Sequence, residues 1–558
     1  MLSRLIQTFS VVRLLKSLSI YSIDKAMANE YVEDIVCQES EVPDNGMKVC
    51  DLGSDGGKVL LVKQKGEIFA VGTKCSHYGA PLANGALGNG RVRCPWHGAC
   101  FNIKTGDIED FPGLDSIPCY SVEVIEGGGV KVRARKHDLE KNKRMKNMVA
   151  KSPSNNNTFI IVGGGAAGQV CAETLRQEGF SGKLIMICAE KYSPYDRIKL
   201  SKQLDLGIDK IQLRPNTFYN EHDIDIMLNT KLVKLDAEKK TLELDNGQSL
   251  SYNLVFLATG SKPRKVDLPG VNLNNVFTLR SLSDASNINS SLSPESNVVI
   301  YGSSFIGMET AAYCVSHCKS VTVVGRSETP FQESLGSQLG NRIAKLFTDK
   351  GVHLKMSKSI TEIKGETKVE SVVLSDGETI PADVVILGLG STFATEYLEG
   401  SGVDRSPSGS VLVNQFLETN CAGVFAGGDI AEAPVLAYDN NKRAAIGHWG
   451  LAHYHGRIAA LNMVSKATPL KTVPFFWTML FGTSFRYAGY GKAFDDIVGG
   501  GDLENLKYAC YYCKGDKVIA VTTVGVDPIA AAFAERLSSG QEVLKSTVVS
   551  NPLSWHKD

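Results

Sequence analysis

The sequence has no surplus of charge of either sign. Its 60 Lys and Arg residues balance 60 Asp and Glu residues, so the formal net charge is zero. Binding to nucleic acid or to anionic lipid usually starts from a basic field, and this chain as a whole has none. We therefore expect no nucleic-acid partner.

Long apolar runs and the cysteine density of a disulfide scaffold are also missing. No run of about 18 apolar residues occurs, so the sequence predicts no transmembrane helix. Thirteen cysteines in 558 residues are too few for a disulfide scaffold, which favours a reducing compartment. The 54 glycines follow no fixed period, which excludes a collagen-like repeat and indicates loops and turns.

The first 23 residues have a composition of their own. They contain Arg4, Arg13, Lys16 and several serines, and the first acidic residue is Asp24. This composition is typical of a mitochondrial presequence, and a disordered tail or a poor secretory signal are the alternatives. We interpret residues 1–30 as a targeting segment and expect a mitochondrial location, with the cytoplasm as the alternative.

A length of 558 residues predicts about three or four domains. Short β-like runs between turns predict a small all-β domain, and a Lys- and Asn-rich stretch then predicts a solvated linker. Two strand, glycine-loop and helix units follow, typical of doubly wound α/β domains, and strand-like alternation returns in a small α+β domain. The expected boundaries are 31–135 for the all-β domain, 136–157 for the linker, 158–295 and 384–466 for the first nucleotide-binding domain, 296–383 for the second, and 467–558 for the C-terminal domain.

Two short loops each combine one cysteine with one histidine. Cys75-Ser76-His77 is followed after sixteen residues by Cys94-Pro95-Trp96-His97. Two thiolates on one iron and two imidazoles on the other form a Rieske [2Fe–2S] centre. A Cys₂His₂ zinc site is the alternative, but zinc fingers place two cysteines together and two histidines together on a helix. We predict that Cys75, His77, Cys94 and His97 are the cluster ligands.

These loops carry a family resemblance. The segment CSHYGAPLANG…CPWHGACFNIKTGD resembles Rieske ferredoxin-type domains, and the whole chain resembles apoptosis-inducing-factor-like proteins, which join such a domain to a flavin reductase. High-potential Rieske proteins carry an extra cysteine in each loop, and Ala80 and Trp96 stand at those positions here. The resemblance therefore implies the lower-potential, ferredoxin-like branch. We interpret Cys100 as a buried small residue and not as a fifth ligand.

A first dinucleotide loop follows the strand Ile160-Ile161-Val162. It reads Gly163, Gly164, Gly165, Ala166, Ala167, Gly168, a GxGxxG pattern before a predicted helix, and Glu190 follows the next strand. The three glycines of the pattern permit a tight turn, close backbone approach to a pyrophosphate and close packing of helix on strand. Glu190 is expected to hold the ribose hydroxyls.

Three further segments resemble FAD-dependent pyridine-nucleotide reductases. They are Pro194-Tyr195-Asp196-Arg197 with Leu200-Ser201-Lys202, then Leu257-Ala258-Thr259-Gly260, and then Thr419 to Asp429. The resemblance implies that FAD is bound by Arg197, Lys202, Thr259, Gly260, the backbone of Val233, and Asp429 at the ribityl chain. A solvated loop is the alternative for Arg197 and Lys202. His448, Trp449 and Trp477 resemble aromatic positions that line the flavin, and core aromatics are the alternative.

The segment from Ser193 to Leu206 holds no cysteine, although disulfide reductases of this family place a Cys-x₄-Cys pair there. Electrons must therefore leave the flavin by another route, and the Rieske domain offers one. Cys510 and Cys513 form a CxxC, but they lie in a strand-like run in which residues three apart point to opposite faces. We interpret them as core residues.

A second dinucleotide loop, from Gly302 to Gly307, carries Ser304 in place of the middle glycine. The serine Cβ is expected to weaken backbone approach to the pyrophosphate. Arg326 follows the next strand where an NADH enzyme usually has an acid, which favours NADPH over NADH, with a solvated turn arginine as the alternative. Glu309 resembles the family carboxylate that pairs with a lysine near the flavin and nicotinamide, here Lys202, so both are candidate catalytic residues.

Together these motifs predict an NAD(P)H-dependent FAD oxidoreductase. NAD(P)H delivers a hydride to FAD, and electrons then pass singly to the [2Fe–2S] cluster and to a one-electron acceptor of protein or small-molecule type. The alternative, which the resemblance suggests, is a pro-apoptotic signalling protein whose cofactor state controls partner binding. The sequence leaves a homodimer open.

Overall fold

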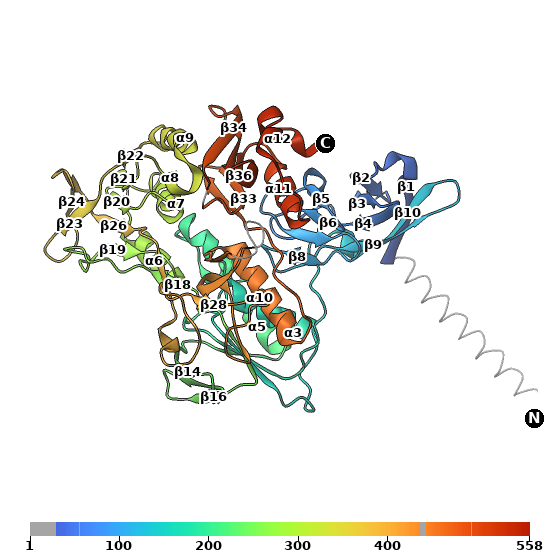
Figure 1. The fold of residues 1–558 in the computed structure, drawn as a ribbon, viewed down its shortest axis with the longest axis horizontal. Helices are drawn as coiled ribbons and strands as arrows, with labels where there is room; N and C mark the ends of the chain where they lie inside the picture. The colour runs from blue at the N-terminus through green and yellow to red at the C-terminus, as the bar shows by residue number, and fades with distance from the viewer. Residues whose placement is uncertain (1–29, 55, 436–441, 493, 558) are drawn as a thin grey trace, which may run out of the picture. The chain divides into compact units, whose positions relative to one another are not determined.

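The computed structural model describes residues 30–557 apart from 55, 436–441 and 493, and it divides into two compact units at 146/147 (Figure 1). All of the predicted targeting segment except Glu30 lies outside the described residues. Over the range that is described, no helix is long and apolar enough to cross a membrane.

The first unit is built from β-strands, as predicted. A six-stranded sheet has the order β1-β10-β9-β4-β3-β2, and a four-stranded sheet has the order β5-β6-β7-β8. Side chains alternate between the two faces of each strand, and this explains the core. In β10, for example, Val130, Val132 and Ala134 are buried while Arg133 and Arg135 are exposed. The strands are β1 (Tyr31–Gln38), β2 (Gly46–Leu52), β3 (Gly57–Gln64), β4 (Glu67–Val71), β5 (Ala86–Gly88), β6 (Arg91–Arg93), β7 (Cys100–Asn102), β8 (Ile108–Asp110), β9 (Cys119–Val124) and β10 (Gly129–Arg135).

Hydrogen bonds fix both halves of the segment 136–157, which was expected to be a solvated linker. Residues 136–139 form the short helix α2 (Lys136–Leu139), and the backbone N–H of Ser116 donates to Arg144. Farther on, the N–H groups of Val149 and Ser152 donate to carbonyls of the second unit. The Lys and Asn composition indicates exposed side chains, but the backbone N–H and C=O groups of the segment still require hydrogen-bond partners.

The second unit contains two parallel sheets of five strands. Their orders are β13-β12-β11-β17-β29 and β19-β26-β20-β21-β22, and both have the doubly wound arrangement that the sequence predicted. The strands of the first are β11 (Thr158–Val162), β12 (Lys183–Ile187), β13 (Ile224–Met227), β17 (Leu254–Leu257) and β29 (Val424–Ala426). Those of the second are β19 (Val276–Thr278), β20 (Asn297–Tyr301), β21 (Ser320–Val324), β22 (Val352–Lys355) and β26 (Val384–Leu387).

Two expected boundaries within this unit are displaced by one strand each. β26 pairs with β20, and β19 pairs with β26, so both strands belong to the second parallel sheet. The sequence analysis had put them in the first nucleotide-binding domain, with boundaries at 295/296 and 383/384. Strand pairing is a long-range property that local composition does not record, and this explains the error.

Smaller sheets, antiparallel except for the parallel β28–β30 pair, accompany the parallel ones, and a five-stranded sheet of order β32-β33-β36-β35-β34 forms the C-terminal module. The smaller sheets comprise β14 (Leu232–Asp236), β15 (Thr241–Leu244) and β16 (Ser249–Ser251); β23 (Ile360–Lys364), β24 (Ser371–Leu374) and β25 (Thr379–Pro381); β28 (Val411–Leu412), β30 (Ala431–Pro434) and β31 (Arg443–Ala445); and β18 (Ser261–Pro263) with β27 (Ser391–Phe393). The C-terminal strands are β32 (Phe475–Leu480), β33 (Thr483–Gly489), β34 (Asp496–Asp502), β35 (Lys507–Lys514) and β36 (Lys517–Val524).

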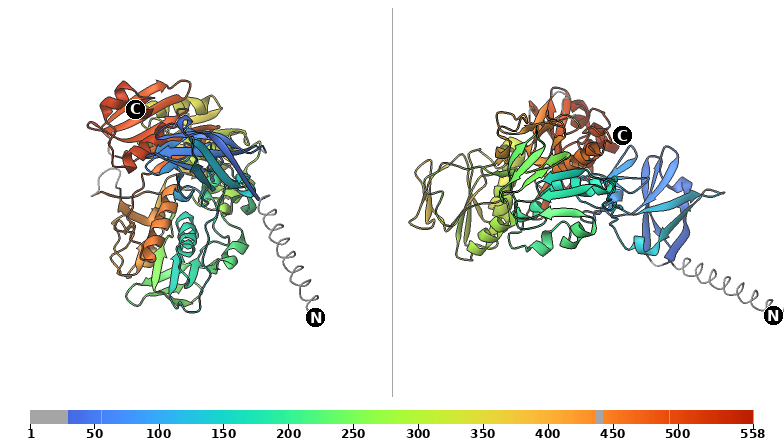
Figure 2. Two further views of the ribbon diagram at one scale, coloured as in Figure 1. Left: turned by 90° about the vertical axis from the view of Figure 1, so that its right-hand side faces the viewer. Right: turned by 90° about the horizontal axis from the view of Figure 1, so that it is seen from below.

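Helices cover the sheets of the second unit, and α3 and α10 lie side by side (Figures 1 and 2). A Cβ on Gly456 of α10 would lie 2.2 Å from the Ala167 carbonyl oxygen of α3, so only glycine permits this approach. The helices are α3 (Ala166–Gln177), α4 (Ile208–Ile211), α5 (Asn216–Glu221), α6 (Leu282–Ser291), α7 (Phe305–Cys314), α8 (Gln332–Leu335), α9 (Ser337–Thr348), α10 (Trp449–Met463), α11 (Ile529–Ser538) and α12 (Lys545–Ser550).

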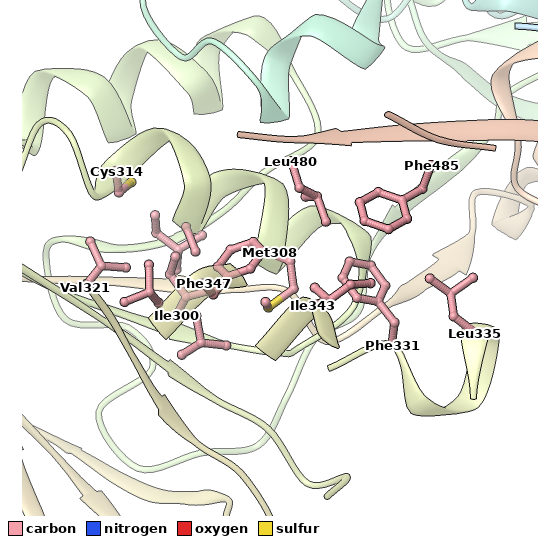
Figure 3. Close-up of a cluster of buried hydrophobic side chains, with 14 of the residues drawn as sticks. Ile300, Met308, Cys314, Val321, Phe331, Leu335, Ile343, Phe347, Leu480 and Phe485 are labelled. Carbon is pink, nitrogen blue, oxygen red and sulfur yellow. The ribbon is translucent and has the colours of Figure 1, made fainter. Parts of the chain in front are cut away.

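One buried cluster joins the second parallel sheet to the C-terminal module. Ile300 and Met308 of the nucleotide-binding half share it with Leu480 and Phe485 of the C-terminal sheet, as Figure 3 shows. This continuous apolar packing explains why α7 and β32, which are far apart in the sequence, are held together.

Candidate functional site

The two predicted ligand loops have the same backbone hydrogen bonds. The N–H of Cys75 donates to Ala80, and the N–H of Cys94 donates to the corresponding Ala99, at 2.9 and 2.7 Å between N and O. In each loop a glycine N–H then donates back to the cysteine carbonyl, from Gly79 and from Gly98. The matching turns explain how two separate sequence motifs present their side chains in the same way.

These loops bring the four predicted ligands together. The Cys75 thiol makes a hydrogen bond with the Cys94 thiol, and the imidazole rings of His77 and His97 have centroids 5.0 Å apart. Both cysteines are buried, whereas both histidines are partly exposed. Two paired thiols and two paired imidazoles fit a binuclear cluster with two ligands on each iron.

The buried Arg93 supports the second ligand loop, and the sequence analysis did not single it out. Its Nη1 donates to the Gly98 carbonyl at 2.8 Å, and its Nη2 lies 3.1 Å from Oδ2 of the buried Asp110. A buried arginine requires such a charge partner. Arg93 is the last residue of β6, in which Arg, Val and Arg alternate, and no local motif distinguishes it from a solvated arginine.

The first dinucleotide loop fits a pyrophosphate. A Cβ on Gly168 would lie 1.9 Å from the Gly163 carbonyl oxygen, so glycine is required where α3 approaches the loop. A Cβ on Gly165, at the N-cap of α3, would meet no atom within 4 Å. Open space at a helix N-terminus, where N–H groups are free to bind an anion, suits a dinucleotide phosphate.

Glu190 and Arg197, both predicted to bind FAD, form an ion pair with each other. The hydroxyl of Tyr195 also donates to Glu190, and the Arg197 guanidinium lies 4.7 Å from the Tyr195 ring centroid. Arg197 further donates to the carbonyl of Arg280 at 3.1 Å. Arg197 is therefore not a solvated loop residue, and the pair orders the segment that leads to Lys202.

Asp429 lies among residues that other predicted FAD segments supply. Its Oδ2 accepts hydrogen bonds from Ser261 at 2.8 Å and from Arg280 at 3.2 Å. Arg280 also lies beside Gly260, where a Cβ would be 3.0 Å from the guanidinium. Thr259, next to Gly260, donates instead to the carbonyl of Ala394 at 2.7 Å. Arg280 and Ser261 were not predicted, because neither belongs to one of the recognised motifs.

Lys202 and Glu309 form the predicted pair, with Nζ 2.9 Å from Oε1. The Glu309 side chain is 5% exposed and accepts two more hydrogen bonds, from Ser201 and, at 2.6 Å, from Thr478 of β32. A buried carboxylate is stable only when its charge is balanced and its oxygens are bonded, and these partners do both. Thr478 was not predicted, because only the folded chain brings it to Glu309.

The second dinucleotide loop has nearly the same backbone as the first. Ser304, the N-cap of α7, has φ −106° and ψ −165°, close to the −94° and −168° of Gly165. The extended conformation is open to any residue, so serine does not strain the loop. Gly307 is required as Gly168 is, because a Cβ would lie 2.0 Å from the Gly302 carbonyl oxygen. Arg326, after β21, is exposed.

The predicted flavin-lining aromatics lie near one another. His448 caps α10, and its ring centroid lies 6.1 Å from Trp477. Trp449 instead contacts His453, with centroids 4.9 Å apart. Val233 is exposed in β14, and the β14–β15 ladder skips it, which leaves its backbone outside that pairing. Their contact with flavin stays a prediction.

Cys510 and Cys513 are both buried in β35. Burial raises the pKa of each thiol to about 11. A raised pKa suppresses the reactive thiolate, in agreement with their interpretation as core residues.

We predict that Gly165→Val and Gly168→Val have different effects, although they change the same loop. In Gly165→Val the new side chain would enter the open space that is predicted to hold the pyrophosphate. This variant should therefore fold normally but retain less than about a tenth of the flavin. Gly168→Val should also lower thermal stability, because its Cβ meets a carbonyl. Flavin absorbance per protein and circular dichroism measure the two effects, and full flavin retention by Gly165→Val would contradict the prediction.

Stability of the second unit should fall in acid because of His455. Its Nδ1 accepts from the Gly428 N–H at 3.2 Å, and burial lowers its pKa from 6.5 to about 4 although Asp429 opposes the shift. The unfolded chain therefore binds a proton first, so stability is full above pH 6.5 and is lost toward pH 4, by roughly 3 kcal/mol. Calorimetry at several pH values should show a smaller acid loss in His455→Gln. An equal loss in both would rule out this origin.

Comparisons with known proteins agree with this architecture. Residues 33–121 match the Rieske [2Fe-2S] domain, and residues 157–456 match the pyridine nucleotide-disulphide oxidoreductase family. Human apoptosis-inducing factor 3 is 45% identical over 93% of this chain and 86% of its own. The rubredoxin-NAD(+) reductase of Pseudomonas putida is 30% identical over 66% of this chain and 96% of its own.

A solved structure shares the reductase fold. The ferredoxin reductase from Rhodopseudomonas palustris superposes with a TM-score of 0.68 at 26% identity, over 72% of this chain and 99% of its own. The protein is therefore an oxidoreductase that depends on FAD, a [2Fe–2S] cluster and a pyridine nucleotide. The chain belongs to the apoptosis-inducing-factor-like family of pyridine nucleotide-disulphide oxidoreductases that carry a Rieske domain.

Proposed function

We propose that this chain passes electrons from NAD(P)H through FAD to its own Rieske cluster and then to a one-electron acceptor. One observation carries the proposal: a full set of cluster ligands, Cys75, His77, Cys94 and His97, accompanies a reductase whose 193–206 segment lacks a cysteine pair. When bound, the flavin links the two-electron chemistry of nicotinamide to one-electron carriers. The rubredoxin-NAD(+) reductase and ferredoxin reductase relatives are named for such carriers.

The chain's own residues bind and orient the groups. We propose that Gly165 and the α3 N-terminus hold the FAD pyrophosphate, while Asp429 holds the ribityl chain. Lys202, kept in position by the buried Glu309, presents a cation at the predicted flavin edge. These residues position charges and rings, and the proposal requires no general acid or base.

We propose NADPH as the preferred donor. Arg326 is exposed at the end of β21, and Gly325 before it is held by hydrogen bonds with the backbones of Lys355 and Lys358. A fixed turn that presents a guanidinium suits a 2′-phosphate, whereas an acid at this position would repel it.

The donor preference predicts the effect of Arg326→Asp. The variant should lose about tenfold in kcat/KM for NADPH, equivalent to about 1.4 kcal/mol, with little loss for NADH. Lys350→Asp, an equal charge change at an exposed lysine elsewhere, is the control and should leave the ratio unchanged. Equal losses for both nucleotides in Arg326→Asp would contradict the preference.

A cluster-ligand variant tests the electron route. Cys94→Ser should keep NADPH-dependent flavin reduction but lose at least about tenfold in the steady-state reduction of cytochrome c, because the one-electron carrier is removed. Cys100→Ser alters a buried neighbour outside the predicted ligand set and serves as the matched control. Undiminished cytochrome c reduction by Cys94→Ser would exclude the route. A single slow reduction of the wild type without turnover would favour the redox-signalling alternative.

We also propose a mitochondrial location, which rests on the basic, serine-containing residues 1–30. Fusion of these residues to a fluorescent protein should direct it to mitochondria, and Arg13→Glu with Lys16→Glu should abolish import because a presequence requires positive charge. Diffuse cytoplasmic fluorescence of the unaltered fusion would contradict the proposal.

A further inference from the structure

Two cysteines meet at the C-terminal end of α7, outside the proposed electron route. Cys314 is the last residue of the helix and is fully buried, and Cys318 lies four residues later and is partly buried. Val315 keeps helical dihedral angles, and the N–H of His317 donates to the Cys314 carbonyl at 2.9 Å. This turn brings residue 318 back to the end of the helix.

The two thiols make a hydrogen bond and have different environments. The bond from Cys314 lowers the pKa of the Cys318 thiol, although partial burial opposes the shift. The same bond and burial raise the pKa of Cys314 well above its usual value. Cys314 packs in the apolar cluster with Met308 and Val321 (Figure 3). Cys318 is therefore the more exposed and the more readily ionised thiol, and Cys314 is its buried partner.

Other cysteine pairs differ in geometry. Cys37 and Cys50 of the first unit also make a thiol contact, in which burial raises the pKa of Cys50 to about 12, but they lie on separate strands, β1 and β2. Cys510 and Cys513, although they form a CxxC, are three residues apart in a strand and point to opposite faces. Neither pair places a partly exposed thiol against a buried one at a helical turn.

We propose that Cys318 and Cys314 form a dithiol that hydrogen peroxide oxidises to a disulfide. The Cys318 sulfur attacks one peroxide oxygen, the O–O bond breaks, and a sulfenic acid and one water form. The Cys314 sulfur then displaces the hydroxyl from Cys318, which forms the S–S bond and releases a second water. Two thiols lose two electrons and two protons, and one peroxide gains them.

The geometry requires only a small adjustment for this bond. Residues four apart on a helical turn have Cβ atoms roughly 5–6 Å apart, and a disulfide requires about 3.8 Å. The pair ends the helix that also carries Gly307 and Glu309. Oxidation therefore modifies the nucleotide-binding helix at the end opposite its dinucleotide loop.

Peptide mass spectrometry tests the proposal on the holoprotein. Because no Lys or Arg lies between them, both cysteines stay on the tryptic peptide that ends at Lys319. After brief treatment with stoichiometric peroxide and alkylation of free thiols, the wild type should show an internal 314–318 disulfide. Cys314→Ala should instead trap Cys318 as a sulfenic acid that reacts with dimedone, and Cys318→Ser should show neither product. Visible absorbance confirms that the cluster survives.

Absence of the 314–318 disulfide in the folded wild type would overturn the proposal. Dimedone labelling of Cys314 in Cys318→Ser would overturn the assignment of Cys318 as the attacking thiol.

Discussion

Burial of the Glu309 carboxylate is the constraint on which the second unit depends. Removing a carboxylate from water costs several kcal/mol unless charge and hydrogen bonds replace the solvent. The replacements come from two separate parts of the chain, since Lys202 and Ser201 belong to the FAD half and Thr478 to the C-terminal sheet. The carboxylate can be buried only where α7, the Lys202 segment and β32 have assembled.

Close backbone approaches impose a second constraint on the same unit. Gly168 and Gly307 let each nucleotide-binding helix approach its loop, and Gly456 lets α10 approach α3. The first two could be predicted, because their spacing follows a strand and precedes a helix. Gly456 could not, because its requirement arises from a helix more than 280 residues away in the chain.

The same distinction separates the predicted site residues from those that sequence reasoning missed. The Cys-x-His and Cys-x-x-His loops and the Lys202–Glu309 pair follow from local motifs, and the structure brings each set together. The missed residues are Arg93, Arg280 and Thr478. Each supports the site through a hydrogen bond to a residue 5 to 169 positions away in the sequence, and no local motif marks any of them. Strand pairing across the second parallel sheet likewise displaced the expected domain boundaries.

Anaerobic rapid mixing of the cluster-loaded protein with NADPH, with flavin and Rieske absorbance followed separately, tests whether electrons pass from flavin to cluster within one chain. Such transfer predicts that the flavin bleaches first and that the cluster is reduced within milliseconds to seconds, at a rate independent of protein concentration, because donor and acceptor share one chain. A cluster that stays oxidised after the flavin is reduced, or that is reduced in proportion to protein concentration, would contradict transfer within the chain.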